Sequence, residues 1–592
     1  MSNSGDFVSH FRERVAEQGD KAALVFLADS GAGVSERAIG YAELDRRARR
    51  VAAWLGERTG RGDRALLLFL PGPEFMVGFL GCLYAGVVAV PAPMPDSNGR
   101  GMSRVAGIAR DAAVRAVLSH ATAIDAVTAW AERSDLGDAV GVAAVDALPE
   151  DLADAWSRPA LDGATIAFLQ YTSGSTSDPK GVVVTHANLL HNEEEIRLAL
   201  GTDAETTVCG WLPQFHDMGL IGQLLHPLYL GGTSVFMSPM TFLKRPYLWL
   251  WAVSEHRASI GVAPNFAFDL AVRRISDEQL ATLDLSSVRW VLNGSEPIQA
   301  HTVEAFTERF AAAGLRPDAV FPCYGLAETT LFVTGSRDGR RSIVVDPRAL
   351  ERNEIVATAA PGGRALVGSG STLGFEIRIV DPDTHTVLPD GRTGEIWVRG
   401  DSVAAGYWKQ PELTEATFNA VADGEPGYLR TGDIGALVDG ELYVTGRLKD
   451  MLIVNGRNLY PHDIEHTARR AHPALQAGVG ASFVVGERPE RLVLVHEIKA
   501  SALNGTPVTD LLASVRAEVR AEFDVHIAEL VLLPRGGVAR TTSGKIRRGE
   551  MRSKFLAGKL ATPPELTAET TETAETTKPT EVSGAVISGA VR

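Results

Sequence analysis

The chain has 592 residues, of which 45% are hydrophobic, so it is too long for one ordinary domain and we expect two or more folded units. Its formal net charge of -15 provides no broad positive field, which excludes general binding to nucleic acid or to an anionic membrane surface. Any binding of phosphate groups must therefore be local.

Cysteine usage and hydropathy indicate the compartment. Cys82, Cys209 and Cys323 lie far apart and have neither CxxC nor His spacing, which argues against a disulfide framework and against a zinc site. The N-terminus alternates charges and lacks the apolar segment of a secretory signal. The longest apolar run, from Met76 to Val90, is shorter than the roughly 20 residues of a membrane span and predicts a buried helix followed by a strand. We expect a cytoplasmic protein without a membrane span.

The first half of the chain alternates strand-like runs with longer helical stretches. The strand-like runs are AALVF, RALLLFL, VVAVPAP, RAVLSH, VGVAAV and TIAFLQY. The segment YAELDRRARRVAAWLGERTG has the spacing of an amphipathic helix. This alternation predicts an α/β fold with parallel sheets, in a large N-terminal domain over 1–447.

The pattern changes in the second half. From about Phe375 onward, FEIRIVD, GEIWVRG, ELYVTG and MLIVNG predict close-set strands, so we expect a smaller β-rich subdomain over about 340–447. Residues 448–560 predict a strand, the helix PHDIEHTARRA, two strands and a helix from Thr509 to Phe523, which together form an α+β C-terminal domain. Residues 561–592 are rich in Thr, Glu, Pro and Ala, a composition that predicts a disordered tail.

The strongest local signal is the segment YTSGSTSDPKGVVVTH, which follows the predicted strand TIAFLQ. Glycine allows a close approach of the backbone, hydroxyl groups and N–H groups surround phosphate oxygens, and a lysine adds positive charge. The predicted phosphate-binding residues are Thr172, Ser173, Gly174, Ser175, Thr176 and Lys180. The segment is not a Walker A loop, since Pro179 and Gly181 stand where that motif requires Gly and Ser or Thr. A generic loop of this composition is a flexible linker, but the preceding strand and the PKG that follows argue against a linker.

This loop resembles the phosphate-binding signature of the adenylate-forming superfamily, which includes acyl-CoA ligases, amino-acid adenylation domains and luciferases. Further segments resemble its other signatures, in the same order along the chain: WLPQFHDMGLIG, NGSEPI, CYGLAETT, YLRTGDIG, GRLKDMLIVNGRNLYP and TTSGKIRR. Together the signatures run from about Tyr171 to Arg548. The resemblance implies a large domain of two α/β sheets and a β-rich subdomain, followed by a mobile lid.

The resemblance also implies the reaction and its cofactors. A carboxylate attacks the α-phosphorus of ATP and expels pyrophosphate, so negative charge accumulates on two reactants that already repel each other. Glu328 and Thr176 are the implied ligands of Mg²⁺, a hard cation that prefers oxygen. Lys545 is the implied catalytic lysine, carried by the lid to the α-phosphate. Taken alone, Glu328 could equally cap a helix, and Lys545 could belong to a solvated basic run with Arg547 and Arg548.

The remaining nucleotide contacts follow from the same motifs. Tyr324, one turn before Glu328, would stack on adenine, although a Tyr beside Gly is more often core packing. Asp433, in a Gly-Asp turn, would accept hydrogen bonds from both ribose hydroxyls, and Arg447 would hold the ribose from the other side. The implied adenine-binding residues are Gly294, Ser295, Glu296, Pro297, Tyr324, Gly325, Leu326 and Ala327. His216 either gates the acyl tunnel, lies against the nucleotide, or is a structural partner of Asp217.

Three features indicate the branch of the superfamily. Amino-acid adenylation domains carry an Asp to pair the substrate amine, whereas GVAPNFAFDLAV places apolar and aromatic residues around Asn265, which suits an alkyl chain. Phe266 and Phe268 are candidate tunnel-lining residues, although such aromatics are more often core. The long connection over about 336–370, the hinge phrase VNGRNLYPHDIE and WLPQFHDMGLIG resemble fatty acyl-AMP ligases. In that family the insertion restricts the CoA-using conformation.

The resemblance implies transfer of the acyl group to the phosphopantetheine thiol of an acyl carrier protein, with the lid swinging about a hinge at Asp450. The metal segment reads YGLAE where many members carry Thr before Glu, and Ala is compatible with this branch. Since no carrier-protein signature follows the lid, we expect a free-standing enzyme that docks a separate carrier of a polyketide or peptide synthase. The alternatives are a fatty acyl-CoA synthetase and a catalytically silent nucleotide-binding or carrier-docking scaffold. The sequence makes no prediction of the oligomeric state.

Overall fold

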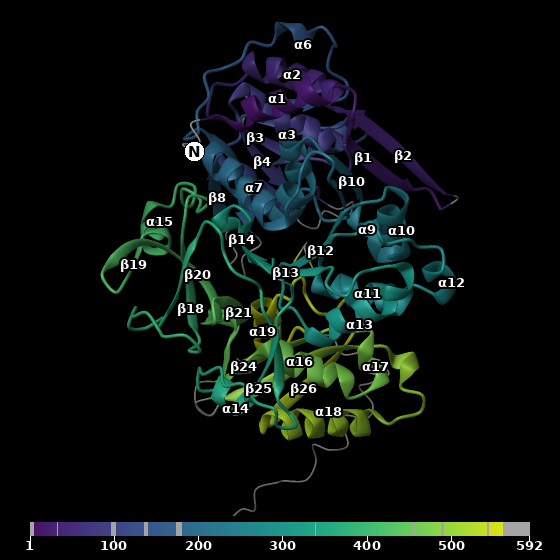
Figure 1. Cartoon of the computed structure of the whole chain (residues 1–592), viewed down its shortest axis with the longest axis vertical. Helices are drawn as coiled ribbons and strands as arrows, with labels where there is room; N and C mark the ends of the chain where they lie inside the picture. The colour runs from purple at the N-terminus through teal and green to yellow at the C-terminus, as the bar shows by residue number, and fades with distance from the viewer. Residues whose placement is uncertain are drawn as a thin grey trace, which may run out of the picture. The chain divides into compact units, whose positions relative to one another are not determined.

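The computed structural model describes residues 5–31, 33–95, 102–134, 136, 140–172, 180–337, 339–454, 457–486, 490–541 and 544–560 (Figure 1). The chain divides into two compact units, the first made of Met1–Lys449 with Thr541–Lys545 and the second of Asp450–Arg540 with Ile546–Arg592. The sequence-based boundary stood at 447/448. The tail predicted over 561–592 lies outside the described residues.

The first sheet of the large unit has six strands in the order β6-β5-β3-β4-β7-β8. Its neighbours are parallel except for β7 and β8, which pair antiparallel. The strand runs and the parallel arrangement predicted for this part of the chain are confirmed. The strands are β3 (Arg64–Leu68), β4 (Val88–Ala92), β5 (Ala116–Ser119), β6 (Gly141–Ala144), β7 (Ile166–Thr172) and β8 (Lys180–Thr185).

The second sheet has eight strands in the order β14-β13-β12-β11-β9-β10-β1-β2. Its inner strands are parallel, and the two edge pairs, β1 with β2 and β13 with β14, are antiparallel. The strands are β1 (Ala22–Asp29), β2 (Val34–Gly40), β9 (Thr207–Gly210), β10 (Thr233–Met237), β11 (Ile260–Pro264), β12 (Trp290–Gly294), β13 (Val320–Gly325) and β14 (Phe332–Gly335).

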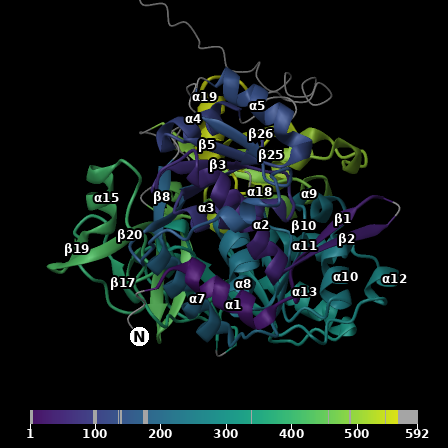
Figure 2. The same ribbon diagram turned by 90° about the horizontal axis from the view of Figure 1, so that it is seen from above.

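Helices α1 (Phe7–Gln18), α2 (Tyr41–Gly56) and α3 (Glu74–Ala85) pack against one another in the N-terminal part of the large unit (Figures 1 and 2). Helix α2 is the predicted amphipathic helix. It packs closely on α3, because a Cβ added at Gly81 would lie 2.5 Å from the side chain of Val51. The apolar run from Met76 to Val90 forms α3 and β4, as predicted, and its side chains are almost all buried.

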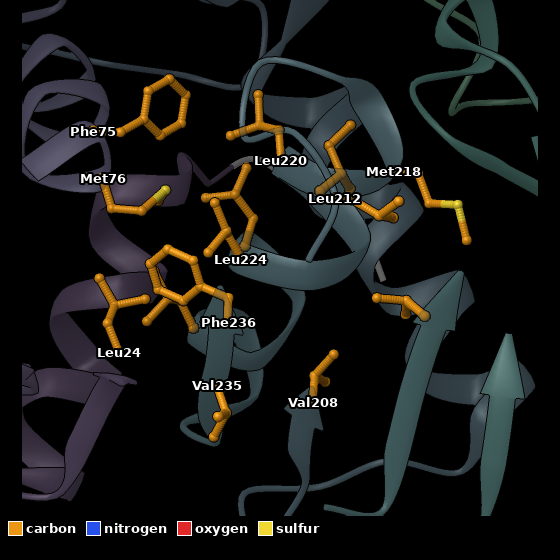
Figure 3. Close-up of a cluster of buried hydrophobic side chains, with 14 of the residues drawn as sticks. Leu24, Phe75, Met76, Val208, Leu212, Met218, Leu220, Leu224, Val235 and Phe236 are labelled. Carbon is orange, nitrogen blue, oxygen red and sulfur yellow. The ribbon is translucent and has the colours of Figure 1, made fainter. Parts of the chain in front are cut away.

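One hydrophobic core joins elements that are distant in the sequence (Figure 3). It includes Leu24 of β1, Met76 of α3 and Phe236 of β10, which face one another. The π-helical segment η2 (Met218–Leu225) adds Leu220 and Leu224 to the same core. The burial of η2 fixes the chain segment immediately before it, which contains His216.

The β-rich part of the large unit is a five-stranded sheet in the order β17-β18-β20-β19, with β21 paired to β20. The strands are β17 (Glu376–Val380), β18 (Gly394–Arg399), β19 (Ala420–Ala422), β20 (Glu425–Val438) and β21 (Glu441–Arg447). The insertion holds β15 (Ser342–Val345), α14 (Pro347–Leu350) and β16 (Arg364–Val367). The predicted Gly-Asp turn is wrong, since Asp433 lies inside the long strand β20, which pairs with β18 on one side and β21 on the other.

The smaller unit is an α+β domain with its own core. Its three-stranded sheet has the order β24-β25-β26, and it also contains a short hairpin, β22 with β23. The elements are β22 (Leu452–Val454), β23 (Arg457–Leu459), α16 (Pro461–Arg470), α17 (Pro473–Gln476), β24 (Gly480–Val485), β25 (Arg491–Ile498), α18 (Val508–Phe523), β26 (Ile527–Pro534) and α19 (Arg548–Leu556). Helices α16 and α18 and strands β22, β24 and β25 correspond to predicted elements, whereas β23, α17 and α19 were not predicted.

Within the described residues, no helix combines the length and the apolar character that crossing a membrane requires. The three cysteines carry free thiols, and Cys82 and Cys209 are buried.

Candidate functional site

The predicted site segments lie at the carboxyl ends of strands. The segment with His216 follows β9, the NGSEPI segment begins at the end of β12, and the CYGLAETT segment begins in β13. Because β9, β11, β12 and β13 are parallel neighbours, their carboxyl ends meet at one edge of the sheet. This edge is where ligands bind in open α/β sheets.

The predicted phosphate loop connects β7 to β8. Thr172 at the end of β7 pairs in register with Lys180 at the start of β8, so the two strands form an antiparallel hairpin. The predicted residues Ser173, Gly174, Ser175 and Thr176 lie outside the described residues. Gln170 of β7 donates a hydrogen bond to the Phe215 carbonyl at 2.8 Å, which connects this hairpin to the segment with His216.

His216 and Asp217 are in direct contact, with 2.6 Å between Nδ1 and Oδ1. Asp217 also accepts the N–H of Met218 at 2.6 Å and so caps the first turn of η2. Burial alone would raise the pKa of Asp217, but the charges of His216 and Lys545 and the hydrogen bonds outweigh burial and hold that pKa at about 2. Asp217 is therefore in the position expected if His216 has a structural role. The roles of His216 toward the acyl chain or nucleotide stay predictions.

The NGSEPI segment leaves β12 in an unusual backbone conformation. Ser295 has a backbone φ of 69°, a value that residues other than Gly rarely adopt. Such conformations are concentrated at functional sites. Glu296 Oε1 accepts the backbone N–H of Phe266 at 2.6 Å, and burial raises the pKa of Glu296. Gly294 ends β12, and Pro297 follows Glu296. The predicted contacts of these residues with adenine stay predictions.

Asp433 is the centre of a buried polar cluster. Its Oδ2 accepts the hydroxyl of Tyr324 at 2.9 Å, and its Oδ1 lies 2.9 Å from Nε of Arg447. Strands β20 and β21 place Asp433 and Arg447 directly opposite each other, and a pocket of about 230 Å³ is lined there by Thr431, Gly432, Arg447, Leu448 and Lys449. The three side chains predicted to bind the nucleoside therefore lie together.

Tyr324 differs from the prediction in one respect. It lies on strand β13 and not one helical turn before Glu328, because Gly325 and Leu326 bend the chain between them. A Cβ at Gly325 would lie 1.8 Å from the Leu331 carbonyl oxygen, so only glycine fits this bend. The Tyr324 ring is buried in a small hydrophobic cluster that includes Leu326, and burial raises the pKa of its hydroxyl well above the ordinary value.

Glu328 lies in the short 3₁₀ turn η4 (Ala327–Thr329), and Ala327 is buried beneath it. Its Oε1 accepts the hydroxyl of Tyr407 at 2.9 Å, and its backbone carbonyl accepts the N–H of Ala404 at 2.9 Å. Burial raises the pKa of Glu328, and the Tyr407 hydroxyl and Arg447 act in the opposite direction. A partly buried carboxylate of this kind is stabilised by a cation.

Lys545 belongs to the large unit, together with Thr541 and the charged residues Asp217, Glu296, Asp433 and Arg447. Its backbone N–H donates to Thr541 Oγ1 at 3.1 Å, and its carbonyl accepts the Thr541 N–H at 2.8 Å, which closes a tight turn. Burial and Arg447 lower the pKa of Lys545, whereas the carboxylates of Asp217, Asp433 and Glu296 act to raise it. Asp433 and Arg447 thus act on the pKa values of both Lys545 and Glu328.

The candidate acyl-binding residues separate into two kinds. Phe266 is partly exposed and meets Trp211 edge-on, with ring centroids 5.8 Å apart. Phe268 is fully buried and packs against Phe306 at 4.8 Å, which is the contact that the core alternative expects, and its tunnel-lining role stays a prediction. Helical spacing turns Phe268 toward α13 (Ala300–Phe310). Asn265 accepts hydrogen bonds from Asn293 and from the N–H of Gln299.

Sequence reasoning missed two residues of this site. Gln170 and Tyr407 contact predicted site segments, but neither belongs to a pattern from which that contact could be predicted. Tyr407 is separated from Glu328 by 79 positions in the chain, and only the folded structure brings them together.

The chain matches the family model described as AMP-binding enzyme over residues 11–408. It is 40% identical over 537 residues to a medium-chain-fatty-acid–[acyl-carrier-protein] ligase, JamA, of Moorena producens, covering 88% of this chain and 90% of that protein. It is 41% identical over 507 residues to the long-chain-fatty-acid–AMP ligase FadD26 of Mycobacterium marinum, covering 82% of this chain and 86% of that protein.

A solved structure shows the same similarity. The crystal structure of a fatty acyl-adenylate ligase from L. pneumophila in complex with acyl adenylate and pyrophosphate superimposes with a TM-score of 0.72 at 36% identity. The match covers 93% of this chain and 96% of that one, so it includes both compact units.

Proposed function

Because the chain belongs to the AMP-binding enzymes and, among them, to the fatty acyl-AMP ligases, we propose that it activates a fatty acid as an acyl-adenylate and passes the acyl group to the phosphopantetheine thiol of an acyl carrier protein. In the first step a carboxylate oxygen of the fatty acid bonds to the α-phosphorus of ATP. The bond from that phosphorus to the bridging oxygen breaks, and pyrophosphate leaves with the electron pair.

The observation that carries this proposal is the contact of Asp433 with both Tyr324 and Arg447, which brings together the three side chains that the motifs assign to the nucleoside. Asp433 accepts the ribose hydroxyls, because a carboxylate has lone pairs for both. Lys545 offsets the charge that develops between the fatty acid and the α-phosphate. We assign His216 to the acyl chain and Lys180 to the phosphates of ATP.

Glu328 suits a magnesium ion that is shared with the substrate. Within the described residues, no three His, Cys, Asp or Glu side chains form a group that could hold a metal ion, so these residues alone offer no complete cage. Mg²⁺ commonly binds to one or two carboxylates and completes its coordination with substrate phosphates and water. Glu328, with Thr176 of the phosphate loop, would hold such an ion. When bound, the ion neutralises charge on the phosphate oxygens.

Two observations favour a carrier protein over free CoA as the acceptor. JamA, which this chain matches over 90% of its length, is named for an acyl carrier protein. The insertion over about 336–370 contains the antiparallel pair β15–β16 and helix α14, and in fatty acyl-AMP ligases such an insertion restricts the CoA-using conformation. We place the enzyme in the cytoplasm, where ATP is available and the free thiols of Cys82 and Cys209 stay reduced.

The test of the whole proposal is a fatty-acid panel in an ATP–pyrophosphate exchange assay, followed by thiol transfer. We expect exchange that depends on the fatty acid. We expect acyl-adenylate to accumulate when CoA is the only thiol and to be consumed when a phosphopantetheinylated carrier protein is added. Rapid formation of acyl-CoA would instead favour a fatty acyl-CoA synthetase.

Lys545→Ala separates an enzyme from a silent scaffold. Removing one charge-stabilising donor from an active site slows catalysis by about a hundredfold to a thousandfold, and we expect a loss of this size in the exchange rate. The matched control is Lys559→Ala, at an exposed lysine of the same terminal region, which should exchange like the native chain. Equal exchange by the native chain and the Lys545 variant, with both folded, would exclude the catalytic role.

A further inference from the structure

Residues 401–408 connect two parts of the site. This segment lies antiparallel beside β8, the strand that begins at Lys180 directly after the phosphate loop. The Ala405 N–H donates to the Val183 carbonyl at 3.0 Å, and the Trp408 N–H donates to the Gly181 carbonyl at 2.8 Å. At its other end, the Ala404 N–H donates to the backbone of Glu328 at 2.9 Å. The segment is therefore held to both the phosphate-loop strand and the Glu328 turn.

Tyr407 is the side chain of this segment that contacts both charged groups. Its hydroxyl donates to Glu328 Oε1 at 2.9 Å, and the ammonium of Lys180 lies 5.4 Å from the centroid of its ring. The ring is itself held, because Phe418 packs edge-on against it at 5.1 Å and the Tyr407 N–H donates to Thr414 Oγ1 at 2.9 Å. Tyr407 is partly buried, which strengthens both interactions.

These two contacts have different physical effects. A hydroxyl that donates to a carboxylate fixes the orientation of that carboxylate and leaves its other oxygen available. The face of an aromatic ring attracts a cation within about 6 Å of its centroid without neutralising it. One tyrosine thus orients the carboxylate of Glu328 and the ammonium of Lys180 without joining them in an ion pair, which would withdraw both from a ligand.

We propose that Tyr407 is a positioning residue that sets the spacing between the carboxylate of Glu328 and the ammonium of Lys180, so that the magnesium ion and the phosphates of ATP are received together. This inference rests on the proposed function, because it assigns Glu328 to the cation and Lys180 to the phosphates. In this role Tyr407 contacts neither the magnesium ion nor the phosphates, and it acts through Glu328 and Lys180.

The two contacts can be separated by two substitutions. Tyr407→Phe removes the hydroxyl and keeps the ring, whereas Tyr407→Leu removes both. For each variant we would measure binding of α,β-methylene-ATP by calorimetry, with and without Mg²⁺, and the Mg²⁺ dependence of ATP–pyrophosphate exchange. The unfolding temperature of each variant reports whether it is folded.

For Tyr407→Phe we expect the Mg²⁺ concentration for half-maximal exchange to rise about tenfold, as for loss of a hydrogen bond to a charged group. Binding of the ATP analogue without Mg²⁺ should stay within about twofold of the native value, because the ring still holds Lys180. For Tyr407→Leu we expect the same change in Mg²⁺ dependence and, in addition, analogue binding without Mg²⁺ weakened about threefold to fivefold.

A remote substitution shows whether the effect is specific to Tyr407. Tyr247→Phe likewise removes a tyrosine hydroxyl, one that shares a hydrogen bond with Thr282. This control should keep the native Mg²⁺ dependence. A Tyr247→Phe variant that reproduces the Tyr407→Phe phenotype would overturn the inference, as would a folded Tyr407→Phe variant with native Mg²⁺ dependence. Absence of exchange in the native chain would instead refute the proposed function.

Discussion

Asp433 shows how one residue is prepared for its ligand before the ligand arrives. Both carboxylate oxygens already have partners, Tyr324 on one side and Arg447 on the other, and only 5% of the residue is exposed. A buried carboxylate without such partners would be costly. The same partners hold its orientation, so a ribose meets an acceptor whose position is already set.

Replacing Asp433 by Asn tests this. The amide keeps the size but loses the charge that pairs with Arg447 and one of the two acceptor oxygens. We expect the KM for ATP to rise at least about tenfold, since a hydrogen bond from a neutral hydroxyl to a charged carboxylate contributes about 1.5–3 kcal/mol. The control is Asp439→Asn, at an exposed turn between β20 and β21, which should keep the native KM. A native KM in the Asp433 variant would remove this residue from the nucleotide site.

At the level of secondary-structure elements, α1 is attached to α7 (His186–Leu200) through a histidine. The N–H of Phe7, at the start of α1, donates to Nδ1 of His186 at 3.2 Å, and His186 is buried. Burial lowers the pKa of His186 to about 4, although the charges of Asp6 and Asp162 act to raise it. The contact requires a neutral imidazole, because a protonated Nδ1 cannot accept a hydrogen bond.

This contact makes stability depend on pH. Because the folded-state pKa lies below the ordinary value of about 6.5, the unfolded chain binds more protons between those two values. The contribution of His186 is complete above about pH 6.5 and is lost as the pH falls toward about 4. From about pH 7.5 to about pH 5, the native chain should lose about 2 kcal/mol of unfolding free energy relative to His186→Gln. Denaturant unfolding of both proteins at a series of pH values measures this, and parallel pH profiles would contradict it.

At the level of the whole molecule, the two units have separate hydrophobic cores. The core of the smaller unit includes Ile464 of α16, Leu494 of β25 and Val515 of α18, which are all fully buried. It also contains a buried ion pair, in which Arg548 contacts Glu465 at 2.6 Å. A unit with a complete core and a three-stranded sheet has what an independently folding domain requires.

We therefore expect a fragment of residues 450–560 to fold alone. Its thermal unfolding, followed by circular dichroism, should be a single cooperative transition, as in other domains of about this size. Glu465→Gln in the same fragment should lower the transition temperature, because it leaves Arg548 buried with a weakened partner. A fragment that unfolds without a cooperative transition would show that its core depends on the large unit.

Local patterns were sufficient for much of this protein. Hydrophobic periodicity predicted α2 and the strands of the six-stranded sheet, because helices and strands repeat at different spacings and each buries one face. The motif order predicted the family, and glycine, hydroxyl and lysine residues predicted the phosphate loop, because these residue types are what phosphate binding needs nearby in the chain. The roles of Ser173 to Thr176 and of Lys545 remain predictions.

Other features depended on contacts between distant segments. Asp433 was expected in a turn because Gly-Asp pairs favour turns, but its pairing with Arg447 of β21 draws it into β20. Phe268 resembled a tunnel residue by composition, and packing against Phe306 places it in the core. Tyr407 has no local signal at all, since its partner Glu328 lies on another strand connection. The residue types that a reaction needs occur together in short segments of the sequence. The distances between those segments in space are set only when the sheets and loops pack together.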